Sequence, residues 1–199
     1  WDVFFFDWEY YHNHLLEIPY IWQGGMAIQG GIIFACIAAY FYLKKHQIPV
    51  LPFADTVTPG IILGQAIGRI ANFMNGDAFG HPTGQDFGLL YPDTTLAYHT
   101  YGAQPLWPAE VWECQGDLLI FVLLLWYGCK TRAEGTTFCL YIMFYSLLRF
   151  FLENYRGDYG TLALGLKSAQ LTSLAAFAGA FILFLYFHFK HKSKSGISE

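Results

Sequence analysis

Residues 68–80 read Gly-Arg-Ile-Ala-Asn-Phe-Met-Asn-Gly-Asp-Ala-Phe-Gly, and they place an arginine near the end of an apolar helix. Two asparagines, an aspartate and two glycines follow that arginine closely. If the helix crosses a membrane, Arg69 is a buried cation, which costs about 2.5–3.5 kcal/mol at mid-bilayer. A chain keeps such a group when it binds something, and an anionic lipid head group is the natural partner in a membrane.

The composition of the chain favours a membrane protein. Of its 199 residues, 55% are hydrophobic and 13% are charged, whereas soluble domains carry about 25% charged residues. The four cysteines form no CxxC pair, so we interpret them as buried thiols and not as disulfides or a zinc site. The net charge of −4, with no basic patch outside the C-terminal tail, argues against a nucleic-acid partner.

Five apolar segments predict an all-α fold, a polytopic integral membrane bundle of about five transmembrane helices that forms one domain over residues 1–199. Each segment is close to the 17–25 residues that span a hydrocarbon core as a helix. The segments are residues 26–43, 53–73, 109–127, 136–154 and 168–189.

The positions of lysine and arginine predict the orientation. Lys44 and Lys45 follow the first segment, Lys130 and Arg132 follow the third, and three lysines follow the fifth, so alternating spans put all of them on the cytoplasmic side. We therefore expect an extracytoplasmic interfacial segment, an extracytoplasmic loop and a basic cytoplasmic tail, at residues 1–25, 76–108 and 190–199 respectively. The remaining basic residues lie in or near the outer half and become functional candidates: Arg69, Arg149, Arg156 and Lys167.

Three predicted helices carry charges at a similar depth near the outer side. Arg69 lies about 9 Å below the outer end of its helix, with Asn72 on the same face. Two further sets share a face by their spacing: Arg149, Glu153 and Arg156, and Glu110, Glu113 and Asp117. Two arginines can bind a phosphate through forked hydrogen bonds, while the acids can pair with them or hold a hydroxyl or a nucleophile.

Plainer interpretations stay open at this point. Arg149 and Glu153 could be a structural i,i+4 ion pair, and Arg69 could reach the interface without any ligand. The glycines of residues 68–80 could serve helix packing and a turn alone. Glu110 and Asp117 are the weakest candidates, because acids near a helix start are often solvated or favour the helix dipole.

The opening stretch resembles the signature G-R-x-x-N-F-x-N-G-E-x-x-G of bacterial prolipoprotein diacylglyceryl transferases. Four more segments resemble motifs of the same family in the same order. Residues 22–31 are similar to W-x-G-G-M-x-x-H-G-G, residues 108–113 to P-S-Q-L-Y-E, residues 149–156 to R-x-x-x-E-x-x-R, and residues 168–173 to the G-Q-x-x-S of the last helix. The five matches together cover nearly the whole chain.

The resemblance implies transfer of the diacylglyceryl group of phosphatidylglycerol to the lipobox cysteine thiol of a prolipoprotein, with release of glycerol phosphate. It implies a multi-pass protein of the bacterial cytoplasmic (inner) membrane whose active site faces the outer leaflet. The implied partners are phosphatidylglycerol, the prolipoprotein cysteine and membrane lipids, with no nucleic acid, metal or cofactor.

By the same match, Arg69 would bind the head group and Arg149 would stabilise charge on the departing phosphate, both as catalytic residues. The other residues of the implied substrate site would shape or support it: Gln29, Gly30, Asn72, Asn75, Asp77, Gly80, Glu113, Glu153 and Arg156.

The chain departs from the family pattern in several places. Gln29 stands where the family usually has a histidine, sometimes assigned as the base for the thiol, and glutamine takes no proton at neutral pH. Either that histidine is not the obligate base, or another group such as His81 serves, or this member is slow or inactive. Asp77 replaces a glutamate, and Glu110 adds a charge. Because the chain begins at Trp1 without Met, we expect a fragment that lacks the family's N-terminal helices.

Two rival functions follow. A catalytically lapsed paralogue that still binds phosphatidylglycerol is motivated by Gln29 and Asp77. A transporter or scaffold with an anion-lined cavity would show substrate flux or partner binding without any change to the phospholipid, and the lack of inverted halves argues against a transporter.

Overall fold

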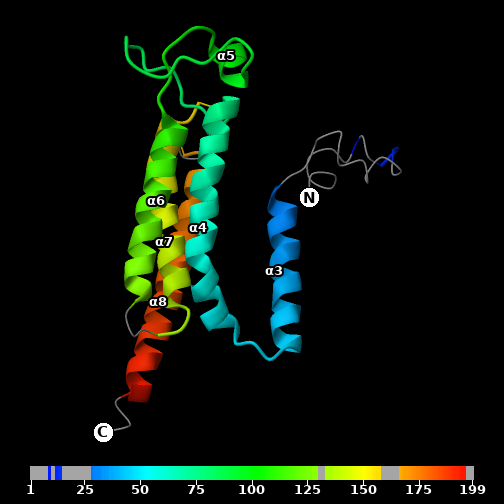
Figure 1. Ribbon diagram of the computed structural model, residues 1–199, viewed down its shortest axis with the longest axis vertical. Helices are drawn as coiled ribbons and strands as arrows, with labels where there is room; N and C mark the ends of the chain where they lie inside the picture. Colours follow the sequence, from blue (N-terminus) through cyan, green and yellow to red (C-terminus); the bar gives the residue numbers. More distant parts are fainter. Residues whose placement is uncertain (1–8, 10–11, 15–27, 130–132, 158–165, 196–199) are drawn as a thin grey trace. The chain divides into compact units, whose positions relative to one another are not determined.

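The computed structural model describes residues 9, 12–14, 28–129, 133–157 and 166–195 (Figure 1). Within these ranges the regular structure is helical, with isolated β-bridges and no longer strand. The elements are α3 (Ile28–Lys45), α4 (Val50–Asn75), α5 (Leu96–Tyr101), α6 (Ala109–Gly128), α7 (Thr136–Leu152), the 3₁₀ helix η3 (Glu153–Tyr155) and α8 (Ser168–Ser195). The chain divides into two compact units, Trp1–Val50 and Leu51–Glu199.

The long helices lie where the five apolar segments predicted them, which confirms the all-α prediction. Three of them are long and apolar enough to cross a membrane, over Val50–Asn75, Thr136–Tyr155 and Ser168–Lys192. The helices α3 and α6 are not in this group; α6 carries three acids in its first half, and α3 has 18 residues and ends in two lysines. The count of five spans therefore stays a prediction.

Some predicted segments lie mostly outside the residues that the structure describes. The interfacial segment, residues 1–25, lies outside the described residues except for residues 9 and 12–14, and so do Lys130 and Arg132. The helix α4 begins at Val50, earlier than the predicted residue 53, because Pro52 in its first turn removes only an N–H that would lack a helical partner anyway.

The second unit is a bundle in which α4, α6, α7 and α8 run side by side in alternating directions (Figure 1). The helix α7 packs against both α6 and α8. Ile62 of α4 joins Ile120 and Leu124 of α6 in the buried core, and aromatic residues of α7 pack against them. Many large apolar side chains point outward instead, among them Ile67, Leu119 and Ile182. Such extensive exposed apolar surface is typical of helices that face lipid.

The predicted loop, residues 76–108, forms a small compact region with its own core. Phe79, Ala97 and Leu106 are buried together in it. Leu89 and Leu106 exchange two backbone hydrogen bonds of 2.9 Å. An aromatic cluster then connects this region to the helices, since the ring of Trp107 lies 5.6 Å from Trp112 of α6 and 5.4 Å from Tyr155 of η3. The loop therefore fixes the adjacent ends of α6 and α7.

At the opposite end of the bundle, a buried aspartate of α4 caps α7. Asp55 is 6% exposed. Its Oδ2 accepts a hydrogen bond of 2.7 Å from the backbone N–H of Gly135, and its Oδ1 accepts one of 2.9 Å from that of Phe138. These N–H groups lie at the N-cap and in the first turn of α7, where no helical carbonyl is available. One carboxylate therefore fixes α4 to the start of α7.

We predict that Asp55→Ala lowers the free energy of unfolding by about 1–3 kcal/mol, because two N–H groups at the start of α7, one of them buried, lose their acceptor. Asp55→Asn should cost less, since its side-chain oxygen still accepts one bond. Chemical unfolding in detergent, followed by circular dichroism, measures both values. Asp86→Ala, at an exposed aspartate of the loop, is the matched control, and an equal effect of the Asp55 and Asp86 variants would contradict the capping role.

Candidate active site

The carboxylate of Glu113 is surrounded by three arginines. Glu113 lies on α6 with 1% of its side chain exposed, and Nη2 of Arg69 is 2.9 Å from its Oε1. Nη1 of Arg149 is 3.3 Å from the same oxygen, and Nη1 of Arg156 is 3.5 Å from Oε2. The arginines come from α4, from α7 and from the residue after η3. One buried anion thus holds together three parts of the chain that are far apart in sequence.

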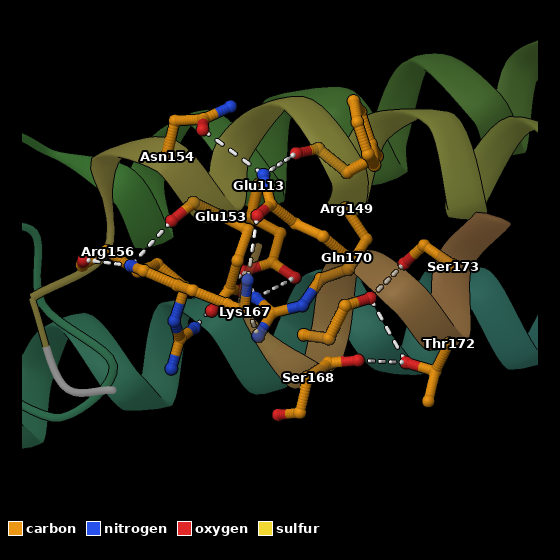
Figure 2. A network of polar contacts seen from close by, with 12 residues as sticks. Glu113, Arg149, Glu153, Asn154, Arg156, Lys167, Ser168, Gln170, Thr172 and Ser173 are labelled. Carbon is orange, nitrogen blue, oxygen red and sulfur yellow. Dashed lines mark hydrogen bonds and ion pairs between the residues drawn. The ribbon is translucent and has the colours of Figure 1, made fainter. Parts of the chain in front are cut away.

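Arg149 also extends the network to a second buried acid. Its Nη2 lies 2.8 Å from Oε2 of Glu153, whose side chain is fully buried. The i,i+4 ion pair considered from the sequence is therefore present, but it belongs to a larger network (Figure 2). Arg69 does not simply extend to the interface, because it contacts Glu113 and donates a 3.3 Å hydrogen bond from Nη1 to Asn72 Oδ1.

The signature loop is paired with the chain that follows α7. The N–H of His81 donates to the carbonyl of Tyr155 at 2.9 Å, and the N–H of Gly157 donates to the carbonyl of Phe79 at 3.1 Å. Gly80 lies opposite Arg156 in this bridge. A Cβ atom on Gly80 would lie 2.2 Å from the carbonyl oxygen of Trp107, so only glycine permits the approach. Glycine at position 80 therefore lets the loop pass close to Trp107 while it pairs with the backbone of Arg156.

The start of α8 supports the same segment from the other side. Lys167 donates from Nζ to the carbonyls of Glu153 and Arg156, at 2.8 and 2.7 Å. Nε2 of Gln170 donates to the carbonyl of Phe150 and to the side chain of Asn154 (Figure 2). Lys167, a candidate by its place in the sequence, thus binds carbonyls at the end of α7, where cations are favoured.

Several predicted site residues are not part of this network. Asn75 is exposed and Asp77 is half-buried, and within the described part of the chain neither side chain makes a hydrogen bond or ion pair. Gly30 lies on α3 in the first unit, and the side chain of Gln29 lies outside the described residues. His81 has Nδ1 2.9 Å from the carbonyl oxygen of Pro82, in the loop region.

Two acids that sequence reasoning ranked lowest are fully buried. Glu110 and Asp117 both have 0% exposure, so the interpretation that these two acids are solvated was wrong. The reason is that α6 begins beneath the packed loop region, where the hydroxyl of Tyr91 donates to Oε1 of Glu110. Among the described residues, Oε2 of Glu110 and both oxygens of Asp117 have no hydrogen-bond partner. Their spacing relative to Glu113 was the available signal, because it puts all three acids on one face.

Comparison with known proteins identifies the family. The sequence model of the prolipoprotein diacylglyceryl transferases matches residues 1–186. The chain belongs to this family. Two phosphatidylglycerol–prolipoprotein diacylglyceryl transferases, from Geobacillus kaustophilus and Staphylococcus saprophyticus, are each 39% identical over 171 residues, which is 85% of this chain. The corresponding protein of Clostridioides difficile is 37% identical over 195 residues, 98% of this chain and 73% of that relative.

The chain spans 63% and 61% of the length of the first two relatives, which is less than two thirds. The family assignment confirms the resemblance drawn from the five motifs. The arginine and acid network of this family member combines residues of three motifs, in residues 68–80, 108–113 and 149–156.

We predict that Glu113→Leu destabilises the protein by about 3–5 kcal/mol, because removal of one partner leaves buried charges uncompensated. Glu113→Asp should recover part of this loss, since it keeps the negative charge on a shorter side chain. Denaturant unfolding in detergent provides the comparison. A Glu113→Leu variant as stable as the wild type would show that the three arginines do not depend on this carboxylate.

Proposed function

We propose that this protein transfers the diacylglyceryl group of phosphatidylglycerol to the lipobox cysteine thiol of prolipoproteins and releases glycerol phosphate. The observation that carries the proposal is the convergence of Arg69 and Arg149 on one oxygen of a buried carboxylate. Two guanidinium groups that meet at one anionic oxygen are arranged as a phosphate oxygen requires. The names of the relatives support the same substrates.

The chemistry needs such a pair of arginines. The sulfur forms a bond to the terminal glyceryl carbon, and the bond from that carbon to the phosphate oxygen breaks. The electron pair of the broken bond leaves on that oxygen, so the phosphate gains a second negative charge while the thiol proton goes to a base. Guanidinium groups fixed before the reaction stabilise the new charge without reorganising. The side chains of Arg69 and Arg149 keep 20% and 15% exposure, so a ligand can reach both.

We further propose that the protein lies in the bacterial cytoplasmic membrane with the arginine cluster on the outer side. The helix α8 begins beside the cluster and ends in a basic tail (Figure 1). Lys167 and Lys190 are about 35 Å apart along such a helix, and the hydrocarbon core is about 30 Å thick. The lysines of residues 190–195 would then face the cytoplasm, as the positive-inside rule requires.

A lapsed paralogue that binds phosphatidylglycerol without transferring it is the second candidate. The observation that favours it is Gln29, which stands where the family usually carries a histidine. In that case the arginine cluster would bind the lipid, but no base would take the thiol proton.

We predict that the native protein, purified in detergent and given phosphatidylglycerol and a lipobox peptide, adds a diacylglyceryl mass to the peptide. Arg69→Ala and Arg149→Ala should each lower the rate by about 100- to 1,000-fold, as loss of one charge-stabilising donor does. The transfer rate of Arg69→Lys should lie between those of the wild type and Arg69→Ala, because lysine keeps the charge but loses the forked hydrogen bonds. Mass spectrometry of the peptide over time gives the rates.

Lys190→Ala, at the far end of α8, is the control and should transfer at the wild-type rate. Full activity in both alanine variants would contradict the phosphate-binding role of the arginines. Binding of phosphatidylglycerol with no mass gain would favour the lapsed paralogue, and Gln29→His would then be the informative variant.

A further inference from the structure

A second layer of polar side chains lies one helical turn beneath the arginines. We call Arg69, Glu113 and Arg149, with Arg156, the arginine layer. Each member of the second layer lies four residues from one of the first three, on the side away from the loop: Gln65 on α4, Asp117 on α6 and Tyr145 on α7. One turn corresponds to about 5.4 Å along a helix. The hydroxyl of Tyr141 donates a 3.0 Å hydrogen bond to Oε1 of Gln65, which connects α7 with α4 at this depth.

Asp117 is the acid of this layer, and the network leaves it without a hydrogen bond among the described residues. It is fully buried, and neither oxygen has a hydrogen-bond partner among the described residues. Buried carboxylates are normally paired or hydrogen-bonded, because an isolated one is costly, so such an exception calls for a function. The charged and titratable groups that face it are Arg69 from α4, Arg149, Tyr141 and Tyr145 from α7, and Glu113 and Cys114 from its own helix.

The charges around Asp117 act on its carboxylate in both directions. Three guanidinium groups contact two carboxylates, those of Glu113 and Glu153. Glu110 also interacts with Arg69 and Arg156, so the network has no cation in excess. Asp117 is attracted by Arg69 and Arg149 and repelled by Glu113. Glu110, the other buried acid of this face, differs because it already accepts a hydrogen bond from Tyr91 on the loop side.

The displacement needs a base close to the attacking sulfur. In a displacement at carbon, the attacking sulfur and the leaving oxygen lie on opposite sides of that carbon. A phosphate oxygen at the arginines and a sulfur one turn deeper would satisfy this requirement. Gly64 and Gly68 of α4 flank this depth, and a Cβ atom on either would have no described atom within 4 Å. These two glycines leave room for a substrate beside the layer.

We propose that Asp117 is the base that accepts the proton of the cysteine thiol, an inference that rests on the proposed function. The S–H proton moves to the Asp117 carboxylate as the sulfur bonds to the glyceryl carbon. The carbon–oxygen bond breaks, and its electron pair departs with the phosphate. Asp117 then returns the proton to the leaving phosphate or to water. A base on α6 lets catalysis proceed with glutamine at position 29.

The test is Asp117→Asn in the native protein, since the amide has the same shape and takes no proton. At neutral pH the transfer rate should fall about 100-fold or more, as loss of a general base does, while the affinity for phosphatidylglycerol stays within twofold. The residual rate should rise with pH toward the thiol's own ionisation at about pH 8.5. A lipobox peptide with selenocysteine in place of cysteine, already ionised at neutral pH, should recover most of the rate.

Two variants separate this role from a structural one. Asp55→Asn alters another buried aspartate, one whose oxygens both accept backbone hydrogen bonds, and it should leave the shape of the pH profile unchanged. His81→Ala removes the candidate base of the loop region and should also leave the profile unchanged. If Asp117→Asn does not fold, Asp117→Glu, which keeps the carboxylate, should fold and retain a measurable rate with a shifted pH profile.

The proposal is overturned if Asp117→Asn keeps the wild-type rate and pH profile, or if neither high pH nor the selenocysteine peptide raises its rate. It is also overturned if Asp117→Glu has the wild-type pH profile. A wild-type protein that binds phosphatidylglycerol and transfers nothing would refute the proposed function itself, and that result is distinct because it appears before any variant is made.

Discussion

The ion pairs between Glu113 and its three arginines are the interaction on which the site depends. Without this carboxylate, three guanidinium groups would lie close together in a largely desolvated place and repel one another. With it, α4, α6 and the end of α7 are fixed at one end of the bundle. Asp55 fixes α4 to the start of α7 at the other end. Two buried acids thus determine how these helices align along their length.

Under the proposed function, the same arrangement prepares the protein for an anionic substrate. The loop region and the start of α8 hold the backbone around Arg156 through Gly80 and Lys167, so this arginine is positioned before any ligand arrives. Because folding has already brought the cations together, a substrate phosphate would meet donors that need little reorganisation. Both the stability of the protein and the proposed binding then depend on Glu113, so a change of this residue affects both.

Much of this arrangement could be predicted from sequence. Apolar length alone located the five long helices, because each segment is long enough to need a helix in lipid. Helical spacing placed Glu113, Arg149, Glu153 and Arg156 on the right faces, and the structure brings them into one network. Spacing gives a face but not what covers it, which is why the burial of Asp117 was missed.

Other features depend on contacts between distant residues. Asp55 and Gly135 are 80 positions apart, so no local pattern indicates the cap. Asn75 and Asp77 belong to the signature, yet the chain turns at Gly76 and Ala78, where φ is 70° and 58°, and neither side chain joins the network. The most direct test of the central claim is solid-state NMR of the native protein, labelled with ¹⁵N-arginine, in phosphatidylglycerol bilayers. Dipolar coupling between lipid ³¹P and the guanidinium nitrogens of both Arg69 and Arg149, lost for each in its alanine variant, is the predicted result. Coupling to neither arginine would contradict the account.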